Sequence, residues 1–289
     1  MKATQTATGV VQVVSEGAVE NVQDGRAHAY VKSTYTPAID LSDIHRAIVD
    51  GRPLGILCAT WGETVPFIRR MEVRREVRRG PRSFFEGTLG GIEVVVTCAG
   101  VGKVNAAMGT QQLIDAYPVW AAINAGAAGA VSERVDLFDI AVITESLHHD
   151  VPSFVLPDSY PYYDGVLFMS SVTLVAAAHH ASEKWRTPFK WARTATGECF
   201  VDDSNRERIV VETVPDTVDM ETAAMAQVCA ANAVPFIAVR CITDTPALSG
   251  FDSYAKHADE ASEYACQATE LVLEELVRFA AEGARKSTE

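Results

Sequence analysis

From Pro53 onward, apolar strand patterns and amphipathic helix patterns take turns along the chain, and this alternation restricts the possible folds. LGILCAT (54–60) predicts a buried strand and ETVPFIRRM (63–71) a helix; IEVVVTCAG (92–100) and GKVNAAMGTQQLIDAY (102–117) repeat the pair. Such alternation is typical of α/β proteins with a buried, mainly parallel sheet. In these sheets ligands bind where strands end and loops begin, so residues at strand ends are the candidates for function.

The alternation continues, and the chain ends in a long predicted helix. Residues 1 to about 50 differ: they contain short strand-like runs and one capped helix, DLSDIHRAIVDG (40–51). We therefore expect an N-terminal extension over residues 1–50 and an α/β domain over residues 51–289. The remaining predicted elements are the strands WAAINAG (120–126), DIAVITE (139–145) and PFIAVRCITD (235–244), the stretch VLFMSSVTLVAAAHHASEKW (166–185), and the helix in VDMETAAMAQVCAANA (218–233).

Composition excludes several classes of protein. The 289-residue chain is 48% hydrophobic and 22% charged, as in ordinary globular proteins, and its net charge of -13 disfavours nucleic acid as a partner. It has no run of about 18 apolar residues that would suggest a membrane span, and its first residues lack the pattern of a signal peptide. The six cysteines stand singly, without CxxC spacing, which indicates reduced core thiols in a cytoplasmic protein.

One segment is strongly basic. RRMEVRREVRRGPR (69–82) contains seven arginines. Paired arginines between valines favour a solvated helix end followed by a strand edge, where positive charge prevents edge-to-edge pairing. The alternative is a patch that binds an anion or RNA.

Three carboxylates stand at the boundaries of apolar elements. Glu63 follows the first strand, Glu221 begins a helix, and Asp244 ends the strand 235–244. Each alone is also explained as a helix-start or turn residue, so spacing leaves both interpretations open. The glycine turn 100–103 lacks the P-loop and GxGxxG spacings. It either lets a ligand approach backbone amides or lets a helix pack on a strand.

Eight segments follow one another in a recognisable order: GILCATWGETV, CAGVGKVNAA, INAGAAGAVSERVDLFDIAVITE, HHDV, TGECF, VDMETAAMAQVC, VPFIAVRCITD and SGFDSYAKHA. This ordered set resembles the purine nucleoside phosphorylase superfamily, and within it the 5′-methylthioadenosine/S-adenosylhomocysteine nucleosidases. The resemblance implies a single α/β domain with a mixed, partly barrel-like central sheet flanked by helices. It also implies the family's reaction, in which water cleaves the bond between adenine and ribose without metal or cofactor, and a homodimer.

The resemblance also implies roles for residues. Glu63 would be the general base that activates water, Glu221 the acid that contacts the ribose hydroxyls, and Asp244 the general acid that protonates the purine. Bond cleavage leaves positive charge on the ribose and negative charge on the base, which explains the need for carboxyls in different protonation states. The implied substrate-binding residues are Met220 under the sugar, Arg240 ordering the carboxylates, Phe200 stacking on adenine, Val201 at the base edge, Phe251 near the 5′ substituent, and Ala99 and Gly100 at the glycine turn.

The acceptor is expected to be water. Bacterial phosphorylases of this superfamily carry cationic phosphate-binding motifs, whereas here an acid, Glu63, follows Thr60-Trp61-Gly62, and 124–127 has neither arginine nor serine. A carboxylate would repel phosphate. Ala99 and Ala127 depart from the nucleosidases, which usually carry serine there. The preferred 5′-substituted adenosine therefore stays open.

Three alternatives remain. The enzyme could be a phosphorylase, or a nucleosidase for a futalosine-type or an AMP-type substrate. In the AMP case, part of the basic segment 69–82 would bind the phosphate. It could be a non-catalytic nucleoside-binding relative, which retention of all three acids disfavours. A metal site at His148-His149-Asp150 or at His179-His180 is disfavoured, because adjacent strand residues point to opposite faces.

Overall fold

The computed structural model describes residues 33–152, 155, 165–248 and 250–286, together with two short strands, β1 (Thr4–Gln5) and β2 (Val11–Gln12), which pair antiparallel. The chain divides into two units, Met1–Val31 and Lys32–Glu289. The expected boundary at residue 50 falls inside the second unit. There β3 (Ser33–Tyr35) joins the sheet, and α1 (Leu41–Val49) contributes the buried Ile44 and Ala47 to the core.

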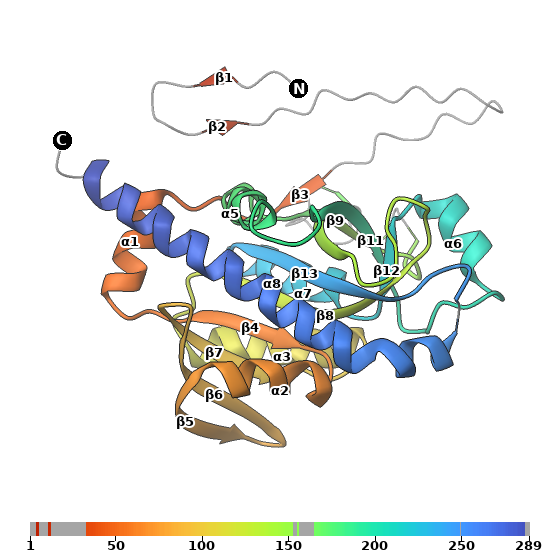
Figure 1. Ribbon diagram of the computed structural model, residues 1–289, viewed down its shortest axis with the longest axis horizontal. Helices are drawn as coiled ribbons and strands as arrows, with labels where there is room; N and C mark the ends of the chain where they lie inside the picture. Colours follow the sequence, from red (N-terminus) through yellow and green to blue (C-terminus); the bar gives the residue numbers. More distant parts are fainter. Residues whose placement is uncertain are drawn as a thin grey trace. The chain divides into compact units, whose positions relative to one another are not determined.

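One mixed sheet of 11 strands runs through the described part of the second unit (Figure 1). Six of its strand pairs are parallel and five are antiparallel, so the sheet is mixed, and parallel pairs outnumber antiparallel ones only narrowly. Besides β3 the strands are β4 (Leu54–Cys58), β5 (Glu72–Arg79), β6 (Arg82–Leu89), β7 (Ile92–Cys98), β8 (Ala122–Ala130), β9 (Ile140–His148), β10 (Leu167–Met169), β11 (Lys190–Thr196), β12 (Thr217–Asp219) and β13 (Phe236–Asp244).

Five strands close into a ring. β8 pairs with β12, β12 with β11, β11 with β9, β9 with β13, and β13 returns to β8. From β8 the sheet continues through β4, β7 and β6 to the edge strand β5, and from β9 through β10 to β3. This arrangement confirms the expected single α/β domain with a mixed, partly barrel-like sheet.

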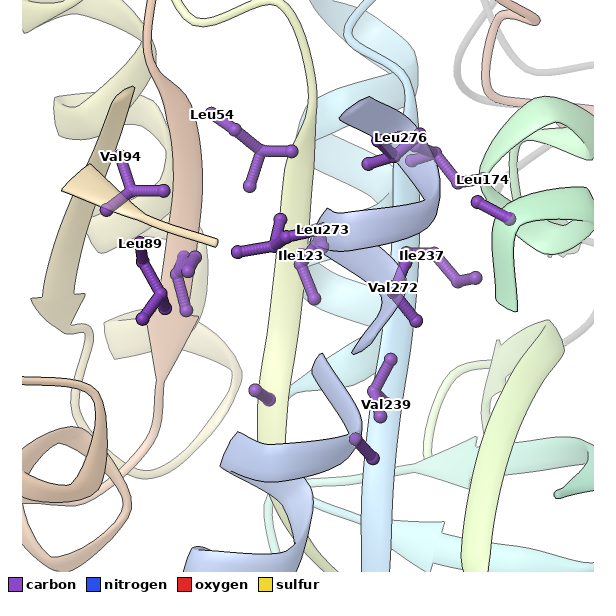
Figure 2. Packing of buried hydrophobic residues seen from close by; sticks show 14 of the residues in the cluster. Leu54, Leu89, Val94, Ile123, Leu174, Ile237, Val239, Val272, Leu273 and Leu276 are labelled. Carbon is purple, nitrogen blue, oxygen red and sulfur yellow. The ribbon is translucent and has the colours of Figure 1, made fainter. Parts of the chain in front are cut away.

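Helices flank the sheet. The longest, α8, crosses it and packs against α1, α2, α5 and β13 (Figure 1). Its buried Leu273 and Leu276 lie among Ile123 of β8 and Ile237 of β13 (Figure 2), and full burial of each such side chain contributes about 1.5–3 kcal/mol. Besides α1 the helices are α2 (Trp61–Arg70), α3 (Lys103–Ala116), α5 (Val172–Ser182), α6 (Arg206–Thr213), α7 (Thr222–Ala231) and α8 (Phe251–Lys286).

The basic segment 69–82 forms the end of α2 and the exposed edge strand β5, as expected. Neighbouring carboxylates pair with several of its arginines: Arg74 with Glu93, and Arg75 with Glu86. Within the described residues, no helix combines the length and the apolar character needed to cross a membrane.

Candidate active site

A cavity of about 330 Å³ lies where β4, β8 and β13 end. Two expected site residues are not part of its lining: Ala99 is buried in the core, and Gly100 lies against Asn105 of α3. Their neighbour Val101 lines the cavity instead. The other eight expected site residues all line it: Glu63, Phe200, Val201, Met220, Glu221, Arg240, Asp244 and Phe251.

Glu63 is fixed by the way α2 begins. Thr60 caps the helix, and its side chain and that of Glu63 form a reciprocal capping box. The Oε2 atom of Glu63 accepts hydrogen bonds from the amides of Ala59 and Thr60, both at 2.8 Å. Its Oε1 atom accepts one from the amide of Ala127 in β8, also at 2.8 Å. Three amides from two parts of the chain thus hold one buried carboxylate at the cavity.

Glu221 joins the glycine turn to Arg240. Its Oε1 atom accepts a hydrogen bond from the amide of Gly102 at 3.0 Å, and its Oε2 atom accepts one from Nη2 of Arg240 at 3.1 Å. Burial and the nearby carboxylates of Asp219 and Glu63 raise the pKa of Glu221, against the attraction of Arg240. The glycine turn therefore does present an amide to an anion, and that anion is a side chain of the protein.

Asp219 precedes Glu221 at the start of α7, where an acid is common, and it has two roles. Its Oδ1 atom accepts hydrogen bonds from the amides of Glu221 and Thr222 at the start of α7. Its Oδ2 atom lies 3.7 Å from Nη2 of Arg240. Arg240 thus faces two carboxylates, and its Nε atom is buried without a hydrogen-bond partner.

Asp244 reaches the cavity through a β-bulge. The register of β13 against β8 shifts between Ile242 and Asp244, so Thr243 is the extra residue, and both Thr243 and Asp244 line the cavity. Thr243 donates a hydrogen bond to Asp244 at 2.9 Å. Burial raises the pKa of Asp244 and outweighs this hydrogen bond. An acid of this kind keeps its proton to higher pH than an exposed aspartate.

An aromatic group forms another part of the lining. The rings of Phe200 and Phe251 meet edge to face with centroids 6.2 Å apart, and Tyr254 lies 6.4 Å from Phe200 and 5.7 Å from Phe251. Met220 adds a further apolar side chain. The cavity therefore combines an apolar surface suited to a flat ring with a carboxylate-rich surface.

Three charged residues connect the loops beside the cavity. Nζ of Lys103 donates to Asp150 at 2.6 Å, and the amide of Lys103 donates to Glu198 at 2.6 Å. Asp150 also accepts from the amide of Glu198 at 3.0 Å. We call Lys103, Asp150 and Glu198 the loop clamp, because it ties the glycine turn to the segment that carries Phe200.

Tyr254 and Cys199 are among the lining residues that sequence reasoning did not assign to the site. Tyr254 lies three positions after Phe251, and this helical spacing could have placed it on the same face of α8. Cys199 was expected to be a buried core thiol, but it is exposed and lines the cavity. Cys58, Cys229, Cys241 and Cys266 are buried as expected.

The cavity offers little to a phosphate group. Among its lining residues Arg240 is the single cation, and it is already paired with Glu221. None of the seven arginines of segment 69–82 lines it, which leaves the AMP-type alternative without support.

The histidine pairs have other surroundings. His148 is hydrogen-bonded to Gln227 at 2.9 Å, and His179, which lies on helix α5 rather than on a strand, stacks on Trp191. Within the described parts of the chain, no three His, Cys, Asp or Glu side chains are grouped so that they could hold a metal ion.

Comparisons with known proteins agree with this geometry. The family model described as "Phosphorylase superfamily" matches residues 53–278. The 5′-methylthioadenosine/S-adenosylhomocysteine nucleosidase of Anoxybacillus flavithermus is 32% identical over 220 residues, which cover 74% of this chain and 95% of that protein. The one from Geobacillus thermodenitrificans is 33% identical over 211 residues, covering 71% and 89%.

The similar solved structures are also nucleosidases. The nucleosidase of the same name from S. pneumoniae, with the transition-state inhibitor MT-ImmA, superposes with a TM-score of 0.70 at 27% identity, covering 78% of this chain and 99% of that one. The Neisseria meningitidis nucleosidase, in complex with methylthio-immucillin-A, gives 0.71 at 26% identity, covering 77% and 99%.

Proposed function

The chain belongs to the phosphorylase superfamily, and on that premise we propose that it is an N-glycosyl hydrolase that releases adenine from a 5′-substituted adenosine. The observation that carries the proposal is the meeting of Glu63, Glu221 and Asp244, all at least nine-tenths buried, in one cavity without a free cation. The substrate class, 5′-methylthioadenosine or S-adenosylhomocysteine, follows from the names of the similar proteins.

In the proposed mechanism, adenine stacks against Phe200 with its edge at Val201, and the ribose lies over Met220. Asp244, whose pKa is raised by burial, acts in its protonated form: it gives its proton to a purine ring nitrogen as the bond to C1′ breaks and the electron pair of that bond moves into the base. Glu63 accepts a proton from the water whose oxygen forms the new bond to C1′. The products are neutral adenine and the free sugar.

Glu221 supports the sugar in this scheme. Its carboxylate accepts hydrogen bonds from ribose hydroxyls, which become better donors as positive charge develops on the ring. Arg240 orients Glu221 through the hydrogen bond at 3.1 Å and balances part of the charge of Asp219, Glu221 and Glu63. Each general acid or base contributes about a 10²- to 10⁴-fold rate increase.

Water is favoured over phosphate as the acceptor. In this mechanism Glu63 faces the attacking group, and the charges of a phosphate beside the carboxylates of Glu63 and Glu221 would be repelled. A non-catalytic binding protein would have no use for a water-activating carboxylate held by three amides.

The test is to incubate the protein with 5′-methylthioadenosine, S-adenosylhomocysteine, adenosine and inosine, with and without phosphate. Adenine and free sugar released at the same rate without phosphate support hydrolysis. Sugar 1-phosphate formed only with phosphate present would show that the enzyme is a phosphorylase.

We further propose that the protein is a homodimer. Large apolar side chains are exposed at the start of α2 and along the glycine turn and helix α3: Trp61, Val101, Val104 and Met108. Val101 also lines the cavity, so a second copy on this surface would help to close the site. Met108→Glu should shift the protein from dimer to monomer in sedimentation, while Val211→Glu, at an exposed residue of α6, should not. A wild-type monomer would contradict the proposal.

We also propose a cytoplasmic location, in keeping with the unpaired thiols, and a role in methionine salvage and purine metabolism.

A further inference from the structure

Two glycines of β8 lie directly against the carboxyl groups of the two proposed proton-transfer residues. A Cβ atom at Gly126 would overlap with Oε1 of Glu63 and lie 2.5 Å from its Cδ. A Cβ atom at Gly129 would lie 2.8 Å from Oδ2 of Asp244 and 3.3 Å from its Cγ. Contacts below 3.0 Å do not occur at real Cβ atoms, so any side chain at either position would move the acid beside it.

The register between β8 and β13 shows which residues lie opposite the two glycines. Gly126 is opposite Arg240 and Gly129 is opposite Asp244 in the parallel pair of β8 and β13. The segment between the two glycines, Ala127 and Ala128, lines the cavity with small side chains and gives the amide of Ala127 to Glu63. One strand therefore contacts the two acids at two separate points.

The side chains of Glu63 and Asp244 differ in how freely they can move. Glu63 is held from the opposite side by the amides of Ala59 and Thr60, so it cannot retreat from β8 without losing these bonds or the one from Ala127. Among the described residues, Asp244 has one side-chain hydrogen-bond partner, Thr243, and can move more easily. A side chain at residue 126 should thus strain the protein, while one at residue 129 should mainly displace the acid.

We propose that Gly126 and Gly129 are positioning residues, each leaving the space in which one acid attains its working position: Gly126 for Glu63 and Gly129 for Asp244. The proposal rests on the proposed function for the assignment of the acids. Its steric part rests on the geometry of β8 alone.

The experiment compares Gly126→Ala and Gly129→Ala with a matched control, Gly62→Ala. Gly62 is next to Glu63 in α2, and a Cβ atom there would meet only Oγ1 of Thr60, at an ordinary 3.7 Å. We expect kcat to fall by about 100-fold in each β8 variant, because a misplacement of about 1 Å has this effect, and to stay within about threefold in the control. Circular dichroism monitors folding in all three.

Adenine binding separates the two positions. Asp244 contacts the base in the proposed mechanism and Glu63 does not, so Gly129→Ala should weaken adenine binding by about 10-fold. This loss corresponds to about one good hydrogen bond to a charged or acidic group. Gly126→Ala should leave it within about threefold. Equal adenine affinities for the two variants, or kcat values near that of the control, would overturn the proposal.

A double-mutant cycle tests Gly126 without any assay of activity. Glu63→Asp shortens the side chain by one methylene and withdraws the carboxylate from β8. Gly126→Ala should therefore lower the urea midpoint of the wild type, but leave that of the Glu63→Asp variant unchanged. An equal loss in both backgrounds would show that Glu63 is not what Gly126 accommodates. If the wild type releases no adenine, the proposed function fails, and this cycle still decides the steric part.

Discussion

Nη2 of Arg240 donates a hydrogen bond to Oε2 of Glu221 over 3.1 Å, in a wall of the cavity where both side chains are almost completely buried. The same guanidinium lies 3.7 Å from Asp219. Burial alone would favour a neutral arginine, but Asp219, Glu221 and Glu63 together raise the pKa of Arg240. One fixed cation, Arg240, therefore holds together carboxylates that would otherwise repel each other.

Arg240→Met should lower the free energy of unfolding by about 3–5 kcal/mol at neutral pH, because it leaves buried carboxylates without a cation. Urea denaturation measures this loss. Arg208→Met is the control: Arg208 is half-exposed and paired with Glu212 on the surface of α6, so its loss should be at most about 0.5 kcal/mol. A loss for Arg240→Met as small as that of the control would contradict the charge-balancing role.

The activity should depend on the proton of Asp244. Burial raises the pKa of Asp244, and the protonated form is the acid, so kcat should fall as the pH rises through this raised pKa. Asp244→Asn should lower kcat by about 10²- to 10⁴-fold and remove this part of the pH profile, without a change in the circular dichroism spectrum. Glu212→Gln, an exposed control, should do neither. Near-normal turnover in Asp244→Asn would exclude Asp244 as the general acid.

Phe200→Ala should weaken substrate binding more than it slows the chemical step. Stacking of a base on an aromatic ring contributes about 1–3 kcal/mol, so KM should rise by about 10- to 100-fold with a smaller change in kcat. Steady-state kinetics with 5′-methylthioadenosine gives both values, and Val211→Ala, at an exposed residue of α6, serves as the control. An unchanged KM would mean that the base lies elsewhere in the cavity.

Asp150→Asn should loosen the loop clamp. Although burial opposes ionisation of Asp150, hydrogen bonds from Lys103 and Glu198 lower its pKa. A carboxylate with a lowered pKa stabilises the fold above its ordinary value near 3.8 and loses this contribution as the pH falls through the lowered pKa. The variant should therefore lose stability at neutral pH and less at acidic pH, and its KM should rise several-fold because Phe200 is less well positioned.

Lys103→Met removes the same ion pair from its other side. The effects of Asp150→Asn and Lys103→Met on KM should not add in the double variant. Additive effects would show that the two residues act independently.

Local patterns predicted much of the fold correctly. The apolar run of β4 and the helix α3 lie near their expected bounds, and α8 is the expected long C-terminal helix. β6, β11 and α6 were not recognised. β11 reads KWARTAT, in which polar residues that are buried by pairing within the ring hide the strand pattern.

The closure of the sheet could not be predicted from periodicity, because it depends on which strands pair. The pairing of β13 with both β8 and β9 joins segments about a hundred residues apart, and no local pattern encodes it. The resemblance supplied that feature of the architecture.

The site residues, too, were predicted only in part. Glu63, Glu221 and Asp244 were identified at element boundaries, and the structure brings them into one cavity. Ala99 is adjacent in sequence to the glycine turn, but its side chain points into the core, which spacing does not reveal. The second role of Asp219 was also missed, because Arg240 is 21 positions further along the chain and meets it only through the sheet.

The ring of five strands has a consequence for how the protein acquires activity. Glu63, Glu221 and Asp244 come from three distant parts of the chain, and β13 can carry Asp244 into place only after pairing with β8. Pairings of such high sequence separation form late and slowly during folding. An unfolded sample that is returned to native conditions should therefore regain its helical circular dichroism signal before it regains catalysis. The rate at which enzyme activity returns then measures the last step of folding.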